Sequence, residues 1–349
     1  MTLSAEFAWH DLPLDVPFGI SRGTTERSGN VVVRLTDEDG RVGIGGGAPS
    51  EYYGEDHESV AAVMPDLLDL VRDVGDPHRL QRIERRMAEA VGGRGADPAA
   101  RSAVSVACHD LVCKGLDLPL YRYWGLDPDR TVSSSYTIGL ADTDAMADRA
   151  AAAVDAGYSV LKVKLGTDRD RDIVAAVREA APDARLRVDA NGAWDPDRAV
   201  AMTEFLAEHD VEFVEQPVPA GDPEGLKRVH DASPLPVAVD ESCVTARDVP
   251  AVADRADVAV VKLAKCGGLR AALRAIHAAH ACDLDVMVGC MTESNASIAA
   301  AAHLGPLVEY ADLDGALLLA EDPFEGIPMP GGRIDLSDWD RPGTGVRER

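Results

Sequence analysis

Five charged residues recur at nearly constant spacing through the middle of the chain. They are Lys164, Asp189, Glu215, Asp240 and Lys262, and successive members lie 25, 26, 25 and 22 positions apart. Each follows a short apolar run typical of a buried strand, so each ends a different strand. In a parallel barrel the carboxyl ends of the strands meet at one mouth, where the active site lies. The spacing therefore predicts a site with two lysines and three carboxylates.

Lysine is scarce in this chain, which makes its placement informative. Six of the 35 basic residues are lysines, and four of these six form two clusters, Lys162 with Lys164 and Lys262 with Lys265. Arginine cannot lose its proton in a protein, whereas a buried lysine can. Chance clustering in an arginine-rich chain is the alternative. The clusters favour acid–base chemistry that arginine cannot perform.

The three acids predict a metal site. Asp189, Glu215 and Asp240 would repel one another if they converged without a counter-charge, and a bound cation resolves this repulsion. Ligation by oxygen alone indicates a hard ion, Mg²⁺ or Mn²⁺, in place of zinc. The nine histidines are scattered without a ligand-spaced pair, so we interpret them as structural.

Alternating apolar and amphipathic segments position these residues. From about residue 131 the chain repeats a short strand and an Ala-rich helical stretch every 25 residues or so. Eight such units favour a closed parallel barrel over a doubly wound open sheet. The expected strands are 133–139, 159–164, 186–189, 212–215, 237–240, 258–262, 286–289 and 309–313.

The first third of the chain has a different rhythm. Residues 1–50 alternate like strands, with a hairpin turn at Asp39-Gly40, and residues 57–115 carry helical periodicity that restarts at Asp97-Pro98. Strands followed by helices predict an α+β domain. The glycine run at 43–47 is not a dinucleotide fingerprint, because Pro49 follows it and no helix begins there.

Charge and composition limit the candidate partners. With 60 acidic and 35 basic residues the net charge is −25, which repels nucleic acid and anionic membrane surfaces but suits a cation. The chain does not begin with a basic segment followed by a long apolar run, so we expect no export signal. No apolar stretch is long enough to span a membrane. The six cysteines lack disulfide or CxxC spacing. We therefore expect a cytoplasmic enzyme without a nucleic-acid or membrane partner.

Six motifs carry a family resemblance. The chain resembles the enolase superfamily, muconate-lactonising subgroup, and within it the dipeptide epimerases, which are isomerases. The resemblance implies a (β/α)₇β TIM-like barrel at residues 126–324 under an N-terminal α+β capping domain at 1–125, with residues 325–349 packing back on that domain. The motifs are KVK (162–164), DANGAW (189–194), EQP (215–217), DES (240–242), KLAKCGG (262–268) and DLDG (312–315).

The resemblance also implies catalytic roles. Lys164 would be the base on one face of the substrate α-carbon, and Lys262 would act on the other face. Lys162 would disfavour the charged form of Lys164 and so lower its pKa. The three acids would hold Mg²⁺ against the substrate carboxylate; the handling of a weakly acidic α-proton by a lysine and Mg²⁺ is a known pattern of this superfamily.

Substrate recognition is implied in the same way. Asp312 and Asp314 would receive the free ammonium group of a dipeptide, and Arg22 would bind a glutamate side chain. Glu293 ends the seventh strand and is expected to line the pocket without an assigned role. The expected reaction is epimerisation of the C-terminal residue of L-Ala-D/L-Glu or a related L-Ala-D/L-Xaa, by a homo-oligomer.

Other activities use the same lysine pair. They are N-acylamino acid racemisation, o-succinylbenzoate synthesis and muconate cycloisomerisation, and Asp312, Asp314 and Arg22 argue against them, since an N-acylated substrate has no ammonium group. An inactive barrel that serves as a binding protein is a more distant alternative, which the complete set of lysines and acids disfavours.

Overall fold

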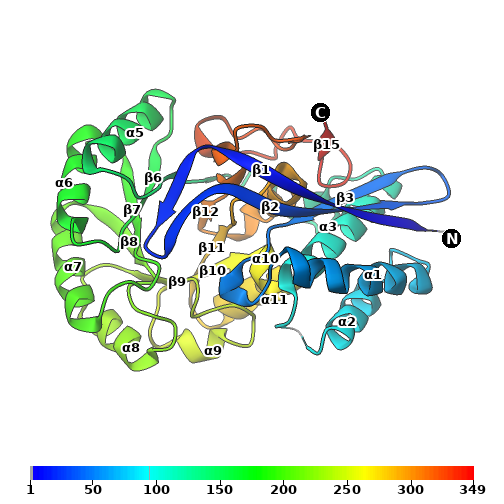
Figure 1. Ribbon diagram of the computed structural model, residues 1–349, viewed down its shortest axis with the longest axis horizontal. Coiled ribbons are helices and arrows are strands. Elements are labelled where there is room, and N and C mark those ends of the chain that lie inside the picture. Colours follow the sequence, from blue (N-terminus) through cyan, green and yellow to red (C-terminus); the bar gives the residue numbers. More distant parts are fainter. Residues whose placement is uncertain (1–2, 94) are drawn as a thin grey trace.

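The computed structural model describes residues 3–93 and 95–349, which form an antiparallel sheet with helices beside a parallel barrel (Figure 1). The antiparallel sheet has the order β1 (Ser4–Ile20), β2 (Gly23–Thr36) and β3 (Val42–Gly47). The turn expected at Asp39-Gly40 lies between β2 and β3. The tip of the β1–β2 hairpin, around Arg22, extends over the barrel.

Helices pack on one face of this sheet and against one another. They are α1 (His57–Val74), α2 (Leu80–Ala90), α3 (Pro98–Gly115) and the short α4 (Leu120–Tyr123), preceded by a 3₁₀ turn, η1, at Glu51–Tyr53. A capping box between Asp56 and Ser59 begins α1, and Pro98 occupies the first turn of α3. Helix α3 is buried on nearly all sides, because it lies between β3, its neighbouring helices and α10 of the barrel.

The glycine run of β3 explains how close α3 comes. A Cβ atom added at Gly43, Gly45 or Gly47 would lie 2.3, 2.2 or 2.5 Å from a backbone oxygen of α3. These three glycines alternate along the strand and therefore share one face. The run is thus a packing surface for a helix, in agreement with its rejection as a nucleotide motif.

Eight parallel strands form the second sheet, in the unbroken chain order β5 to β12. Ser135 N–H donates to Ala311 O at 3.0 Å, which joins the first strand region to the last and brings the barrel close to closure. The fold predicted from the 25-residue repeat is confirmed. Its strands are β5 (Tyr136–Ile138), β6 (Val160–Lys164), β7 (Arg185–Asp189), β8 (Val211–Glu215), β9 (Val237–Val239), β10 (Val258–Lys262), β11 (Asp285–Gly289) and β12 (Tyr310–Asp312).

Helices follow each of the first seven strands and cover the outside of the barrel (Figure 1). Their apolar faces pack on the strands in one large core. Within residues 3–93 and 95–349, no helix has the length and apolar character needed to cross a membrane. The barrel helices are α5 (Thr143–Asp155), α6 (Asp170–Ala180), α7 (Pro196–Glu208), α8 (Pro223–Ala232), α9 (Val249–Val252), α10 (Leu263–Cys266), α11 (Leu269–Ala281) and α12 (Asn295–Ala302).

The C-terminal tail returns to the first sheet and its helices. Gly343 O accepts from Leu120 N–H at 2.8 Å, and Thr344 N–H donates to the buried Asp110 at 2.7 Å. Short strands β13 (Phe324–Glu325) and β15 (Arg347–Glu348) pair with each other, while β14 (Arg333–Ile334) pairs with β4 (Val132–Ser133). The division of the chain at residues 125 and 324 stays a prediction.

Candidate active site

A cavity of about 430 Å³ lies at the mouth of the barrel, beneath the β1–β2 hairpin. Both parts of the chain line it, since Arg22 and Tyr52 come from the first third and the lysines and acids from the ends of barrel strands. Seven of the ten residues predicted from the sequence line this cavity; they are Arg22, Lys162, Lys164, Asp240, Lys262, Asp312 and Asp314.

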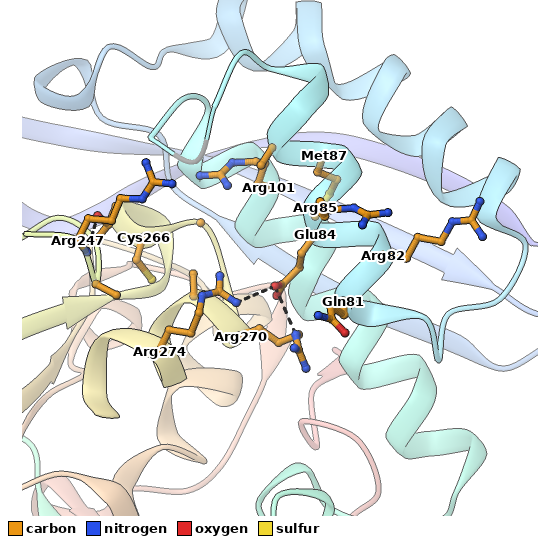
Figure 2. A pocket seen from close by; sticks show the side chains of 15 residues that line it. Gln81, Arg82, Glu84, Arg85, Met87, Arg101, Arg247, Cys266, Arg270 and Arg274 are labelled. Carbon is orange, nitrogen blue, oxygen red and sulfur yellow. Dashed lines mark hydrogen bonds and ion pairs between the residues drawn. The ribbon is translucent and has the colours of Figure 1, made fainter. Parts of the chain in front are cut away.

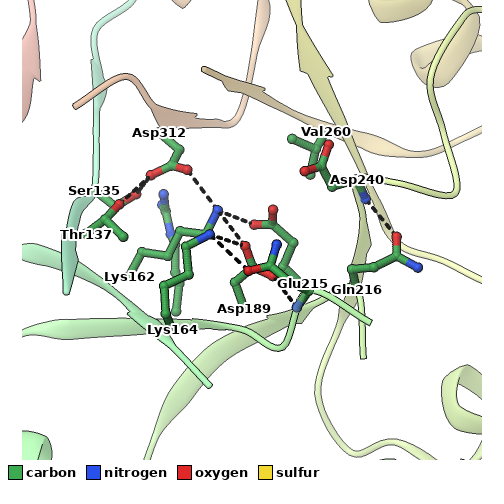
Figure 3. Close-up of polar contacts among 12 residues, drawn as sticks. Ser135, Thr137, Lys162, Lys164, Asp189, Glu215, Gln216, Asp240, Val260 and Asp312 are labelled. Atoms are coloured by element: carbon green, nitrogen blue, oxygen red, sulfur yellow. Dashed lines mark hydrogen bonds and ion pairs between the residues drawn. The ribbon is translucent and has the colours of Figure 1, made fainter. Parts of the chain in front are cut away.

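Lys162 is enclosed by carboxylates. Its Nζ lies 2.7 Å from Glu215 Oε2, 2.8 Å from Asp312 Oδ2 and 3.3 Å from Asp189 Oδ2 (Figure 3). Burial alone would lower the pKa of Lys162, but these carboxylates raise it well above its ordinary value. Lys162 is therefore a counter-charge that holds three acids together, whereas the sequence predicted an electrostatic neighbour of Lys164.

Lys164 and Lys262 lie on opposite sides of the mouth. Lys164 ends β6 and Lys262 ends β10, and strands four places apart face each other across an eight-stranded barrel. Lys164 Nζ lies 2.6 Å from Asp189 Oδ2, and Lys262 Nζ lies 2.7 Å from Asp240 Oδ2. Burial alone would lower the pKa of Lys262, but Asp240 raises it above its ordinary range. In this arrangement each lysine is paired with a different acid.

A fourth lysine, Lys265, supports Asp240 from below. Its fully buried Nζ donates to Asp240 Oδ1 at 2.6 Å, to Asp240 O at 2.7 Å and to Val260 O at 2.7 Å. The first helical turn after β10 places it there, because α10 begins directly after Lys262. Lys265 thus fixes both the side chain and the backbone at the end of β9.

The expectation that Asp189, Glu215 and Asp240 lack a counter-charge is wrong. The lysines pair with all three, and among the described residues no three His, Cys, Asp or Glu side chains form a ready-made metal cluster. Burial alone would raise the pKa of Asp189 and Asp240, but their lysine partners hold both below the ordinary value. A cation would compete with ammonium groups for these oxygens.

Glu215 nevertheless fits a metal ligand. Both of its carboxylate oxygens are buried without a hydrogen-bond donor in the described chain, since Lys162 approaches Oε2 closely but outside hydrogen-bonding geometry. Burial and the charge of Asp189 raise the pKa of Glu215 to about 8. A buried carboxylate with unsatisfied oxygens is costly, and a hard cation would satisfy it. The donor set of three strand-end carboxylates therefore suits Mg²⁺.

Asp312 and Asp314 differ in their surroundings. Asp312 accepts from Ser135 Oγ at 2.6 Å in addition to its contact with Lys162, whereas Asp314 accepts from Thr137 N–H at 2.5 Å. Burial and the charge of Asp312 raise the pKa of Asp314 to about 7. Burial alone would also raise the pKa of Asp312, but Lys162 lowers it. Asp314 is thus the member of the pair without a lysine contact.

Arg22 is held by partners that the sequence did not identify. Its guanidinium lies 2.8 Å from Glu241 Oε1, donates to Asn191 O at 2.8 Å and stacks 4.7 Å from the centre of the Tyr52 ring. Glu241 follows Asp240 in the DES motif, so its position at a strand end was the available signal. Tyr52 gave none, because it lies on a turn far from the barrel motifs.

Glu293 does not occupy its expected place. It is buried and accepts from Met291 N–H at 2.8 Å, and burial raises its pKa. Met291 and Thr292 line the cavity at this point, and Glu293 is not among the described residues that do so. Its carboxylate instead holds the loop after β11 through the hydrogen bond from Met291.

Fold and site together define a barrel enzyme of the enolase type. Residues 5–125 match the N-terminal domain of the mandelate racemase/muconate lactonizing enzyme family, and residues 145–348 match the enolase C-terminal domain-like family. The chain therefore belongs to the mandelate racemase/muconate lactonizing group of the enolase superfamily. This confirms the family predicted from the motifs.

Its relatives include several dipeptide epimerases. An L-Ala-D/L-Glu epimerase of Bacteroides thetaiotaomicron is 36% identical over 339 residues, which are 97% of this chain and 86% of that protein. A hydrophobic dipeptide epimerase of Roseobacter litoralis is 38% identical and covers 94% of each chain. The crystal structure of a dipeptide epimerase from Enterococcus faecalis, complexed with Mg and L-Leu-L-Tyr, superimposes with a TM-score of 0.93 at 32% identity and full coverage of both chains.

Proposed function

We propose that this chain is a Mg²⁺-dependent dipeptide epimerase that inverts the α-carbon of the C-terminal residue of L-Ala-D/L-Glu or a related L-Ala-D/L-Xaa. The observation that carries the proposal is the placement of Lys164 and Lys262 on opposite sides of one cavity, each within 2.7 Å of a carboxylate. Two proton carriers on opposite faces of one carbon are what an inversion requires. The names of the relatives support the same reaction.

One lysine would remove the proton of the α-carbon, and the other would deliver a different proton to the opposite face. One must be neutral to remove the proton while the other, as ammonium, delivers a proton to the opposite face. Asp240 stabilises the ammonium form of Lys262, so this lysine would give up its proton more readily when Asp240 has another partner. Asp189, Glu215 and Asp240 would hold the metal, with Mn²⁺ as a close substitute for Mg²⁺. When bound, the metal supplies positive charge that makes an α-proton beside a carboxylate more acidic.

Recognition of the dipeptide would divide among three charges, of which the main-chain carboxylate would be held by the metal. Asp314, with Asp312 beside it, would bind the substrate ammonium group, and each charge-assisted contact of this kind is worth about 1.5–3 kcal/mol. Arg22 would bind the side-chain carboxylate of a C-terminal glutamate. Because Glu241 already shares the charge of Arg22, the balance between those two residues would set the preference for acidic or apolar side chains.

Location and assembly belong to the same proposal. The six cysteines are all free, and four of them are buried, as is typical of a chain that stays in a reducing compartment. We infer a cytoplasmic homo-oligomer built from 1–125, 126–324 and 325–349 as structural units. Light scattering of the purified protein measures the assembly directly.

The test is a screen of L-Ala-L-Xaa dipeptides in D₂O with added MgCl₂. We expect deuterium at the α-carbon of the C-terminal residue together with formation of the L,D product, and loss of both after exhaustive chelation. A clear preference for N-succinyl or N-acetyl amino acids would overturn the dipeptide assignment and leave the lysine assignment intact. Full turnover after chelation would overturn the metal assignment.

A further inference from the structure

A second cavity, of about 680 Å³, lies away from the barrel mouth between the N-terminal helices and the barrel (Figure 2). Helices α2 and α3 form one wall, and α10, α11 and the loop around Arg247 form the other. Six arginines of the described chain line it, together with one acidic residue, Glu84. The arginines are Arg82, Arg85, Arg101, Arg247, Arg270 and Arg274.

This concentration of positive charge contrasts with the rest of the molecule. The whole chain carries a net charge of −25, yet the described lining of this cavity has an excess of five positive charges, six arginines less one glutamate. Like charges gathered in a partly enclosed space repel one another, because the protein screens them less than water does. Such a cluster attracts a multiply charged anion.

Glu84 neutralises only part of this charge. Its Oε2 lies 3.4 Å from Arg270 Nε and 3.3 Å from Arg274 NH1, and its side chain is 12% exposed. Figure 2 shows Glu84 between these two arginines, with Arg101 and Arg247 on the adjoining side. Other acids lie at the margins of the cavity. Arg85 is 3.7 Å from the exposed Glu89, and Glu55 and Asp97 interact electrostatically with Arg101. Arginines therefore outnumber acidic residues in the described lining of the cavity.

Arg101 is built into the wall and is not a surface side chain. The residue is 5% exposed, and its Nε donates to Ala96 O at 2.8 Å. A Cβ atom on Gly267 would lie 2.4 Å from Arg101 NH2, so the glycine after α10 leaves room for the guanidinium. Gly267 also has a φ of 90°, which favours glycine. The turn between α10 and α11 thus accommodates a buried arginine at this cavity.

We propose that this cavity binds a small polyanion that carries two or more phosphate or carboxylate groups. Guanidinium groups bind such groups through paired hydrogen bonds, which lysine cannot match in geometry. The volume falls within the range of about 300–1,000 Å³ that is usual for small-molecule sites. Arginines from α2, α3, α11 and the Arg247 loop approach from several directions, as recognition of a multiply charged molecule requires.

Occupation of this cavity would brace the two parts of the chain against each other. The loop that carries Arg247 begins at Asp240 and Glu241 of the active site, and α10 begins directly after Lys262. A polyanion held between that loop, α11 and the N-terminal helices would therefore hold these three elements together. This binding site does not depend on the proposed reaction, and its test needs no turnover.

The test uses pyrophosphate and citrate as probes, each titrated into the full chain by calorimetry at low ionic strength, with thermal unfolding in parallel. Arg247→Gln and Arg274→Gln should each weaken binding about tenfold, as expected for loss of one charge-assisted contact. Arg228→Gln is the matched control, because exposed Arg228 on α8 pairs with exposed Asp197 and loses the same charge. Glu84→Gln should bind the probe several times more tightly than wild type.

The opposite directions of these effects separate binding from simple damage to the fold. A variant that merely loosens the structure would not gain affinity, so tighter binding by Glu84→Gln supports the site directly. Stronger binding of pyrophosphate than of citrate assigns the site to phosphate groups, and the reverse order assigns it to polycarboxylates. No saturable binding by wild type, or losses no larger than that of Arg228→Gln, would overturn the proposal. So would equal responses to pyrophosphate, citrate and sodium sulfate at matched ionic strength.

Discussion

At the scale of single residues, the two lysines across the mouth give the sharpest expectation. Lys164→Ala and Lys262→Ala should each abolish epimerisation, with a loss of about 10²–10⁴-fold or more, the usual contribution of a positioned acid or base. Residual deuterium incorporation should occur from opposite stereochemical sides in the two variants, because each retains the lysine of one face. Proton NMR of L,L- and L,D-dipeptides in D₂O measures this. Lys227→Ala, on the outer helix α8, is the control, and a loss below tenfold in either test variant would remove the lysines from the mechanism.

Asp314 predicts a pH dependence of substrate capture. Its pKa in the free protein is raised to about 7, so below pH 7 it becomes neutral and loses its attraction for an ammonium group. kcat/KM for a free dipeptide should therefore fall as the pH drops below 7 and level off about ten- to hundredfold lower, where Asp314 is fully neutral. Above about pH 8 the substrate amine itself loses its proton, so kcat/KM should also fall on the alkaline side.

The matched variant for this profile is Asp314→Asn. It should lower kcat/KM about ten- to hundredfold at pH 7.5 and remove the part of the acidic limb that belongs to Asp314. Thr137 N–H retains an acceptor in the asparagine oxygen, so the loop should keep its structure. An unchanged acidic limb in the variant would show that another group produces it.

The pairing of Arg22 with Glu241 predicts a shift in side-chain preference. Glu241 is 3% exposed and lies 2.8 Å from the guanidinium, so Glu241→Gln should return a full positive charge to the cavity. The ratio of kcat/KM for L-Ala-L-Glu over L-Ala-L-Leu should rise several-fold in Glu241→Gln and fall in Arg22→Gln. Arg27→Gln is the control, because Arg27 lines the same cavity but pairs with exposed Asp11. Equal kcat/KM ratios in all three variants would show that Arg22 takes no part in recognition of the substrate side chain.

These pairings mark the limit of prediction from the sequence at this scale. The spacing of the apolar runs alone predicts which charged residues end strands, because each run ends at a charge. These residues are Lys164, Asp189, Glu215, Asp240 and Lys262. The same spacing does not predict which lysine or arginine nitrogen pairs with which carboxylate oxygen. The partners of Arg22 come from another part of the chain, and those of Lys162 depend on how five side chains share one small buried space.

At the scale of elements, hydrophobic periodicity predicted the barrel strands to within a few residues and helix α3 from Pro98, but it did not predict what α3 packs against. A strand buried in a parallel barrel is a short apolar run between polar boundaries, and it is visible as such. Helix α3 is buried on nearly all sides, so no amphipathic stripe distinguishes its contact with β3 from its contact with α10. Glycines 43, 45 and 47 were the signal for that contact, since side-chain-free positions on one strand face permit close helix packing.

The close approach of β3 and α3 can be tested with one methyl group. Gly45→Ala would place Cβ 2.2 Å from Ala103 O and 2.3 Å from Ala107 N, and backbone atoms of a buried helix cannot turn aside. We expect a loss of about 1–3 kcal/mol in the free energy of unfolding, the usual cost of overpacking. Gly221→Ala is the control, because no atom lies within 4 Å of the added Cβ. Denaturant unfolding that gives both variants the same stability would contradict the packing argument.

At the scale of the whole molecule, the active site and the arginine-lined cavity both lie where the first third of the chain meets the barrel. The active-site cavity uses Arg22 and Tyr52 from above and strand ends from below, and the arginine-lined cavity uses α2 and α3 against α10 and α11. The sequence predicted two parts and a returning tail but not how their surfaces face each other. That arrangement depends on contacts between residues far apart in the chain, which no local period encodes.

Net charge gives the last prediction, which concerns the stability of the whole chain. A charge of −25 on 349 residues produces self-repulsion that disfavours the compact state. Salt screens this repulsion, since the Debye length falls from about 10 Å at 0.1 M to about 3 Å at 1 M. Salt also weakens exposed ion pairs, but these are worth about 0–1 kcal/mol each, and the buried lysine–carboxylate pairs are screened little.

Relief of repulsion should therefore outweigh the loss of surface pairs. The Tm should rise steadily when NaCl is increased from about 0.05 to about 1 M in the presence of a chelator, which keeps divalent metals from stabilising the site. Sucrose at equal osmolality is the control, because it is excluded from protein surfaces without screening charge. A rise that sucrose reproduces in full would assign the effect to exclusion from the surface, and a Tm that falls with NaCl would show that ion pairs outweigh the repulsion among the 60 acidic side chains.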